Sequence, residues 1–264
     1  MKTKSPLVSI LITNYNKKKY LRKMINSCIN QSYKNKEIIF FDDASSDNSL
    51  SIVKQYKSIK VIKNKSKKKK SGPLNQINGI IKCFKKSKGE LIFLLDSDDY
   101  FKKNKLEKIS NYFFNNDRCN FIQDTPVETN RLKKIKLKRK SHFFSIWPQF
   151  CPTSSITVKR KFFSNFLLYL KKNSYKDLEI DARLVIFAYL KGQFRYIEKS
   201  YTFYNNHVEG ITSGYKKYSI NWWKKRNDAF QYMFTLMKVF NLKIIKSPDY
   251  LLTKLVNFLL IKNY

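Results

Sequence analysis

The chain has 264 residues, and its 54 Lys and Arg against 19 Asp and Glu give a formal net charge of +35. Apolar residues make up 42% and aromatic residues 16%, too much for a disordered polyelectrolyte, and the length suits one large domain with or without an appendage. No apolar run approaches the roughly 20 residues that a membrane-spanning helix needs, and the first residues show no signal-peptide cleavage pattern. We therefore expect neither an integral membrane protein nor an exported one.

The four cysteines are far apart in the sequence and include no CxxC pair. This spacing argues against a zinc site or a disulfide framework and favours a reducing, cytoplasmic environment.

The strongly positive net charge has more than one explanation. A strong positive charge is typical of proteins that bind nucleic acid or an anionic membrane surface, but Lys, Asn, Ile, Phe and Tyr are abundant while Ala occurs only four times, as an AT-rich genome would produce. We favour compositional drift first, a membrane-surface contribution next and nucleic acid last.

The first hundred residues alternate strand and helix patterns. Apolar, β-branched runs predict buried strands at 7–13, 37–42, 60–63 and 91–95. Helical spacing and capping residues predict helices at 20–30, 45–56 and 74–86. Continuous apolar strands separated by helices indicate a parallel sheet covered on both faces.

Beyond residue 101 the alternation is less regular. Helices are predicted at 105–114, 160–170 and 177–190, and strands at 120–124, 194–197 and 201–204, while 126–152 is irregular. Two further helices, about 220–240 and 249–261, are expected to form a C-terminal helical extension packed on the sheet domain.

Polar residues follow three of the predicted strands, as Thr13-Asn14-Tyr15-Asn16, Asp42-Asp43 and Asp96-Ser97-Asp98-Asp99. Each segment alone is ordinary turn chemistry. In a parallel sheet, however, ligands bind beyond the carboxyl ends of the strands, so three such ends at one edge predict a ligand site.

The Asp96 and Asp98 side chains project to the same face of an extended chain, while Asp99 points away. Two adjacent carboxylates repel each other unless a cation lies between them, and their hard oxygens favour Mg²⁺ or Mn²⁺. The few glycines form neither a GxGxxG nor a GxxxxGK[ST] loop. A diphosphate bound here would be neutralised by metal rather than by backbone amides.

The chain resembles family 2 glycosyltransferases of the GT-A fold. The resemblance lies in the order of four segments, Val8–Asn16, Gln31-Ser-Tyr33, Glu37–Asp47 and Lys88–Asp99. The resemblance implies a Rossmann-like, mostly parallel α/β sheet flanked by helices. It is dense over 6–110, the expected nucleotide-binding part, and thinner over 111–213, the expected acceptor-binding part. Residues 214–264 would then be the helical extension of a 1–213 transferase domain.

By resemblance, the donor nucleotide is expected at the three strand ends. Thr13 and Tyr15 would frame the base, Asp43 would accept its imide hydrogen, and Asp42 would support the turn. Asp96 would approach the ribose, Ser97 belongs to the same donor-binding stretch, and Asp98 would bind the metal. Gln76 stands near the place where family members often carry an Arg.

The catalytic base of the family usually follows a Glu in a Glu-Asp motif at the start of a helix. Here Asp177 matches the acid while Lys176 replaces the Glu. Asp181, one predicted helical turn later on the same side, is the rival, and Glu179 is a third candidate. Acids at a helix N-terminus can also serve only to stabilise the helix.

Three further segments each have two interpretations. His207 lies in a Tyr-Asn-Asn-His segment similar to the family's Tyr-Arg-x-His, which implies a metal or phosphate contact, whereas His142 is expected to be a packed or surface residue. The 147–155 loop falls where the family lines its acceptor pocket, or it is a buried loop. Trp222-Trp223-Lys-Lys-Arg226 is either packed in the core or an interfacial membrane anchor.

The resulting hypothesis is an inverting, metal-dependent transferase of the hexosyltransferase type that uses a nucleotide-diphosphate sugar, with a UDP-sugar favoured. The expected acceptor is a glycan or lipid-linked hydroxyl in cell-surface polysaccharide synthesis. The expected location is the cytoplasm, with a peripheral position at an anionic inner membrane surface as an addition. The competing hypotheses are a nucleotidyltransferase and a nucleic-acid- or membrane-binding protein with a degenerate transferase fold.

Overall fold

The computed structural model describes residues 5–65, 71–137, 145–170, 174–206 and 215–261. Its main sheet has seven strands in the order β10-β6-β9-β4-β1-β2-β3. Their bounds are β1 Val8–Asn14, β2 Lys36–Asp42, β3 Ile59–Lys63, β4 Leu91–Asp96, β6 Phe121–Asp124, β9 Ile156–Lys159 and β10 Phe194–Ile197. Every neighbouring pair is parallel except the two that β9 makes with β4 and β6. The predicted, mostly parallel sheet is confirmed, while β9 falls where no strand was predicted.

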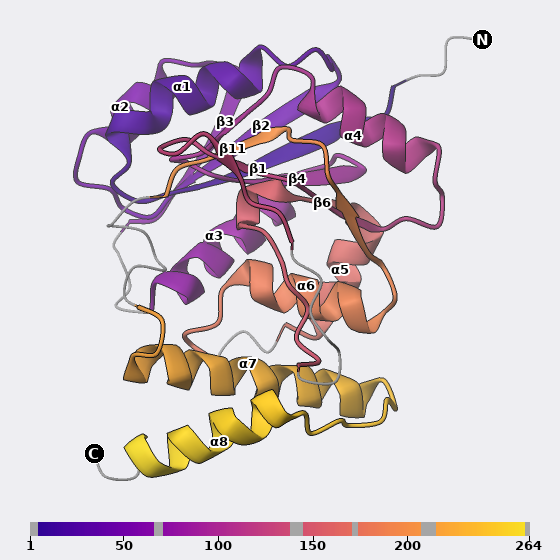
Figure 1. Cartoon of the computed structure of the whole chain (residues 1–264). Coiled ribbons are helices and arrows are strands. Elements are labelled where there is room, and N and C mark those ends of the chain that lie inside the picture. The colour runs from indigo at the N-terminus through magenta and orange to yellow at the C-terminus, as the bar shows by residue number, and fades with distance from the viewer. Residues whose placement is uncertain (1–4, 66–70, 138–144, 171–173, 207–214, 262–264) are drawn as a thin grey trace.

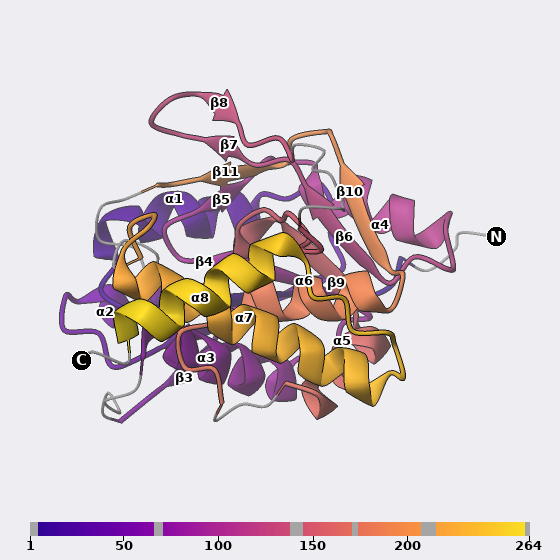
Figure 2. The same cartoon turned by 60° about the horizontal axis from the view of Figure 1, so that its bottom comes forward.

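Helices cover both faces of this sheet (Figure 1). Their bounds are α1 Lys18–Ile29, α2 Ser49–Lys54, α3 Gly72–Lys86, α4 Lys105–Phe114, α5 Arg160–Leu168, α6 Ile180–Leu190, α7 Ile220–Val239 and α8 Pro248–Ile261. Helices α1, α2 and α4 lie on one face, and α3, α5 and α6 lie on the other. Helix α7 packs beyond α6, and α8 packs on α7 at the outer side (Figure 2).

The central strands β1 and β4 are mainly apolar because both of their faces are buried. In β1, Ile10 and Ile12 pack with residues of α1, α2 and α4, whereas Leu11 packs with α3, α5 and α6 on the opposite face. Successive side chains of a strand point to opposite faces, so each strand supplies two cores at once.

A second, small sheet lies at the carboxyl end of β4. Its strands, in the order β5-β11-β7-β8, are β5 Tyr100–Phe101, β11 Thr202–Tyr204, β7 Val127–Glu128 and β8 Lys133–Lys134. Strand β5 directly follows Asp99, and β11 runs antiparallel to it. This pairing carries the segment after Thr202 to the acidic end of β4.

Two predicted helix starts are wrong. The helix predicted from Ser45 begins at Ser49, because Ala44 and Asn48 adopt left-handed backbone angles with φ of 56° and 63°. The helix predicted from Asp177 begins at Ile180. The buried Arg183 guanidinium donates to Leu178 O at 2.9 Å and to Tyr175 O at 2.6 Å, and these bonds hold the preceding turn outside the helix.

Candidate active site

The register of the sheet brings the three polar strand ends into one row. Asn14 at the end of β1 pairs with Asp42 of β2, and Thr13 pairs with Asp96 at the end of β4. The expectation that these segments meet at one edge of the sheet is confirmed. Figure 1 shows β1, β2 and β4 side by side in the centre of the sheet.

Buried hydrogen bonds hold the loop after β2 against the end of β1. Asp42 accepts from Asn14 Nδ2 at 2.9 Å and from the backbone N–H and hydroxyl of Ser45 at 3.0 and 2.6 Å. Asp43 is also buried and accepts from Asn64 Nδ2 at 2.6 Å. Tyr15, by contrast, is 41% exposed at the rim of this edge. Asp42 thus supports the turn, Asp43 is tied to the β1 end by its N–H bond to Asn14 O, and Tyr15 follows β1 as an exposed side chain.

Asp96 lies between polar side chains from two other elements. Its carboxylate accepts from Gln76 Nε2 of α3 at 2.7 Å and from Thr13 Oγ1 of β1 at 3.3 Å. Burial, and then the charge of Asp98, raise the pKa of Asp96 to about 7. The Gln76 Oε1 atom is buried and has no hydrogen-bond partner within the described ranges.

The three residues after Asp96 have different environments. Ser97 is buried and its N–H donates to Thr13 O at 3.2 Å. Asp98 retains 16% exposure and forms an ion pair with Lys17 Nζ at 2.9 Å. Asp99 is buried and fixed by Ser154 Oγ at 2.6 Å and by the Asn205 N–H at 2.8 Å. Asp99 therefore holds the loop in place, while Asp98 is the member of the group that remains accessible.

Strand β11 adds Tyr204, the first residue of the Tyr-Asn-Asn-His segment, to which the sequence analysis assigned no role of its own. Burial raises the pKa of the Tyr204 hydroxyl, and the charges of Asp99, Asp96, Asp181 and Asp98 raise it further. Tyr204 directly precedes Asn205, whose N–H donates to Asp99, so it lies beside the acidic end of β4. Its neighbour Asn205 donates from Nδ2 to the Asp98 carbonyl. The position of this tyrosine depends on the pairing of β11 with β5, for which the sequence gives no local signal.

The two candidate bases face different surroundings. Asp181, in the first turn of α6, accepts from Thr153 Oγ1 at 3.4 Å. Burial and the charge of Glu179 raise the pKa of Asp181 to about 7, and Asp96 also contributes. Asp177 lies in the turn before α6 and accepts from Tyr215 Oη at 2.9 Å. The expectation that the two acids lie on the same side of one helix is therefore wrong, because Asp177 precedes the helix. The charge of Asp96 contributes to the raised pKa of Asp181.

Glu179 and the 147–155 loop both border Asp181. Glu179, the third candidate base, is buried and paired with Lys225 of α7. In the loop, Trp147 packs edge to face on Phe230, while Thr153 and Ser154 contact the acidic residues. His142 and His207 lie outside the described residues.

Carboxylates suitable for a divalent cation are present, although the described part of the chain contains no set of three His, Cys, Asp or Glu placed to hold one. Asp96, Asp98 and Asp99 follow closely on one another, and burial, followed by the charge of the neighbouring carboxylates, raises the pKa of Asp96 and of Asp99. A divalent cation at Asp98 would relieve this repulsion. The Asp98 carboxylate, which retains some exposure, therefore fits such an ion.

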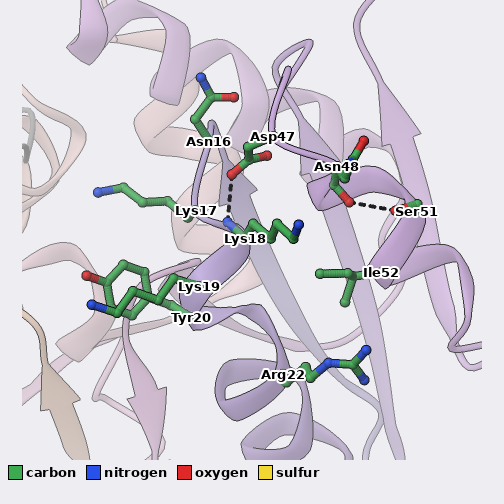
Figure 3. A pocket seen from close by; sticks show the side chains of 10 residues that line it. All are labelled: Asn16, Lys17, Lys18, Lys19, Tyr20, Arg22, Asp47, Asn48, Ser51 and Ile52. Carbon is green, nitrogen blue, oxygen red and sulfur yellow. Dashed lines mark hydrogen bonds between the residues drawn. The ribbon is translucent and has the colours of Figure 1, made fainter.

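A shallow, basic pocket borders this edge at the start of α1 and α2 (Figure 3). It is lined by Asn16, Lys17, Lys18, Lys19, Tyr20, Arg22, Asp47, Asn48, Ser51 and Ile52. The Lys18 N–H donates to Asp47 at 2.8 Å, which ties α1 to the loop before α2. Lys17 connects the pocket with Asp98.

Comparison with known proteins shows which protein family this chain resembles. The sequence profile of glycosyl transferase family 2 matches residues 9–178. An uncharacterised glycosyltransferase of Haemophilus influenzae is 39% identical over 147 residues, covering 53% of this chain and 57% of the relative. The Escherichia coli UDP-Glc:α-D-GlcNAc-diphosphoundecaprenol β-1,3-glucosyltransferase WfaP is 38% identical over 102 residues, covering 38% of each chain. The match thus spans 57% of the length of the first relative and 38% of the second.

A solved structure extends the likeness to nearly the whole chain. The crystal structure of Staphylococcus aureus TarS 1-349 in complex with UDP superposes with a TM-score of 0.65 at 16% identity, covering 97% of this chain and 73% of TarS 1-349. At this identity the match concerns the fold, which is the GT-A-like arrangement expected from the sequence.

Proposed function

The chain belongs to glycosyl transferase family 2, and we propose that it transfers a sugar from a nucleotide-diphosphate sugar to an acceptor hydroxyl with inversion at the anomeric carbon. One observation carries the proposal. Asp96 and Asp98 stand at the edge where an α/β sheet binds its ligands, β11 pairs with β5 directly beyond them, and the Thr153-Ser154 segment contacts both Asp181 and the Asp96 N–H.

The donor occupies the strand ends in this proposal. Tyr15, exposed at the rim, stacks on the base, with Thr13 beside it and Asp43 accepting the imide hydrogen. Asp96 approaches the ribose, with Ser97 in the same stretch. The Oε1 atom of Gln76, which has no partner among the described residues, supports this placement, because a ribose or sugar hydroxyl could donate to it.

Asp98 would hold a Mn²⁺ or Mg²⁺ ion, and His207 is proposed as a second contact. When bound, the ion neutralises the charge that develops on the departing diphosphate. Lys17 pairs with Asp98. Its ammonium group therefore lies where it can form an ion pair with a phosphate of the bound donor.

Asp181 is the proposed base, with Asp177 as the alternative. A carboxylate with a pKa of about 7 is well matched to accept a proton near neutral pH. The acceptor hydroxyl gives its proton to a carboxylate oxygen as its own oxygen attacks the anomeric carbon opposite the leaving diphosphate. A single displacement of this kind inverts the configuration and needs no covalent enzyme intermediate.

The proposed donor is a UDP-hexose and the proposed acceptor is a glycan or lipid-linked glycan of the cell surface. The support is the name of the E. coli relative, which uses UDP-Glc and a diphosphoundecaprenol-linked sugar, and the UDP in the TarS structure. We also propose that 6–110 bind the donor and 111–213 the acceptor within a 1–213 transferase domain, with 214–264 as its helical extension.

Calorimetric titration of UDP, GDP and TDP, with and without Mn²⁺, tests the donor site. We expect one nucleotide to bind in a Mn²⁺-dependent manner, and Asp98→Ala to weaken binding by roughly tenfold or more, since one charge-assisted ligand is lost. Asp117→Ala, which removes an exposed carboxylate after α4, is the matched control and should bind normally.

The second candidate is a binding module on a degenerate transferase fold. The observation that favours it is the replacement of two expected basic residues by Gln76 and Asn205, which removes positive partners for the diphosphate. If no nucleotide binds to the wild type while DNA or anionic vesicles do, the transferase proposal is wrong and this candidate replaces it.

A further inference from the structure

Helix α8 is amphipathic in the opposite sense to an ordinary surface helix. The residues it buries are mainly polar, with Asp249 5% and Thr253 0% exposed. Its leucines point outward, and Leu251, Leu252 and Leu255 are 52%, 47% and 54% exposed. Surface helices normally turn their apolar stripe towards the core. We call the outward residues the leucine face: Leu251, Leu252, Leu255, Phe258, Leu259 and Leu260.

Specific polar contacts fix this orientation. Asp249 pairs with Arg226 of α7 and accepts from Ser145 Oγ at 2.6 Å. Thr253 Oγ1 accepts from Arg226 Nε at 3.0 Å, and Asn257 Nδ2 donates to the Trp223 carbonyl at 3.0 Å. Rotating α8 to bury its leucines would break all of these bonds, so the leucine face is a stable feature of the fold.

The leucine face lies on the outermost layer of the molecule. Figure 1 shows α8 beyond α7 on the side away from the sheet, and in Figure 2 the ribbon of α8 lies in front, with no other described helix or strand drawn over it. Just before the helix, Leu242 and Ile245 are also 39% and 52% exposed. Contiguous exposed apolar surface of this kind marks a docking site.

The charges around this surface have one sign. Lys243, Lys246 and Lys254 are exposed next to it. Between residues 229 and 264 the only acidic residue is Asp249, which is buried and paired with Arg226. A second copy of the chain would bring lysines against lysines at +35 per chain, whereas anionic phosphate head groups would match them.

We propose that the leucine face of α8 docks the protein on an anionic lipid surface. The helix has 14 residues, about 21 Å at 1.5 Å per residue, which is short of the roughly 30 Å hydrocarbon layer. Among the described residues no helix is long and apolar enough to cross a membrane. A helix of this length with one apolar side would lie in the plane of the interface, with its leucines in the acyl boundary and Lys243, Lys246 and Lys254 at the head groups.

This assignment moves the membrane contact away from the Trp222-Trp223 segment. Both tryptophans are only partly exposed, and the Arg226 guanidinium lies 5.1 Å from the Trp222 ring centroid. Arg226 is also occupied by Asp249. The cluster thus joins α7 to α8, and the outward contact belongs to α8. Docking through α8 does not depend on sugar transfer.

Vesicle flotation of the full chain tests the proposal, using phosphatidylcholine alone and phosphatidylcholine mixed with phosphatidylglycerol. We expect the wild type to float with the mixed vesicles and to be released by added salt. Leu251→Gln/Leu255→Gln should weaken partitioning roughly a hundredfold, because each leucine withdrawn from lipid costs about a tenfold factor. Lys243→Glu/Lys246→Glu should abolish the preference for anionic vesicles.

The matched control is Leu132→Gln/Leu168→Gln, which removes two leucines that are 80% and 78% exposed elsewhere. It should float like the wild type, and all variants should keep the wild-type melting temperature and nucleotide binding. Equal loss in both leucine variants, or no flotation of the wild type, overturns the proposal. A concentration-dependent dimer that only the α8 variant disrupts, without vesicle binding, would instead show that a second copy covers the leucine face.

Discussion

Asp177 and Asp181 are four residues apart, and the fold separates their surroundings. The charge of Asp96 helps to raise the pKa of Asp181, after burial and the charge of Glu179, whereas Asp177 accepts a hydrogen bond from the Tyr215 hydroxyl. We expect Asp181→Asn to lower the turnover of the donor sugar by about 10²–10⁴-fold, the usual contribution of a general base. Asp177→Asn, the matched control, should change it by less than about tenfold.

The measurement is the steady-state rate of nucleotide release from whichever donor the titration identifies. In the wild type this rate should rise with pH through about 7, because the Asp181 carboxylate must lose its proton before it can accept one. The reverse order of effects in the two variants would assign the base to Asp177.

The raised pKa of Asp181 also makes stability depend on pH. Its pKa is 3.8 in an unstructured chain and about 7 in the fold, so between these values the folded protein holds a proton that the unfolded chain has released. The free energy of unfolding should therefore fall as pH rises from about 4 to about 7 and level off above. Asp96, raised to about 7 by burial and by Asp98, adds a decline of the same sign.

Denaturant titrations across this pH range, without added metal, measure the decline. Asp181→Asn should make it shallower without removing it, because Asp96 still contributes. A decline in Asp181→Asn as steep as in the wild type would show that Asp181 is not the group that titrates.

At the scale of elements, one buried ion pair connects four segments around the site. Lys105 Nζ of α4 lies 2.8 Å from Asp124 Oδ2 of β6 and donates to Ser154 O at 2.7 Å and Thr202 Oγ1 at 2.6 Å. Ser154 Oγ in turn accepts from the Asp96 N–H at 3.0 Å. The pair therefore positions the acidic end of β4 through its neighbours.

Lys105→Met should destabilise the protein by about 3–5 kcal/mol, because it leaves the Asp124 carboxylate buried without its cation. Lys108→Met, which removes an exposed lysine from the same helix, should cost less than about 0.5 kcal/mol. Urea denaturation of both variants measures the difference. Equal small effects would mean that Asp124 is neutral in the fold.

At the scale of the whole molecule, the two C-terminal helices differ in how they are attached. Phe230, Met233 and Leu236 of α7 are buried in the same apolar cluster as β1 and α6. Helix α8 contributes Tyr250 to that cluster and otherwise makes mainly polar contacts. Within the expected helical extension, α7 is thus attached through apolar burial and α8 mainly through polar contacts.

We expect a chain that ends at residue 241, without α8, to remain folded with a melting temperature lowered by less than about 10 °C. A chain that ends at residue 214 should aggregate, because it exposes the apolar surface that α7 covers. Soluble yield and thermal denaturation compare the two. A stable 1–214 chain would instead favour an independent 1–213 domain.

Much of the fold could be predicted from local patterns. The apolar strands 7–13 and 91–95 and the helix 105–114 appear where expected, because apolar periodicity is a property of the segment itself. The starts of α2 and α6 could not be predicted, because they depend on left-handed residues and on the buried Arg183. Strand β9 was not predicted because its place in the sheet is set by antiparallel pairing with the distant strands β4 and β6.

The sequence by itself determined the alternation of strands and helices, the mostly parallel sheet, the acidic strand ends and the family. These follow from residue type and spacing within short segments. Only the tertiary structure decided which distant groups surround Asp96: Ser154 arrives with the insertion of β9 beside β4, and Tyr204 with the pairing of β11 and β5. It also decided that the leucines of α8 face outward, because the bonds of Arg226 and Asn257 fix the rotation of that helix, and no periodicity within the helix states which side is buried.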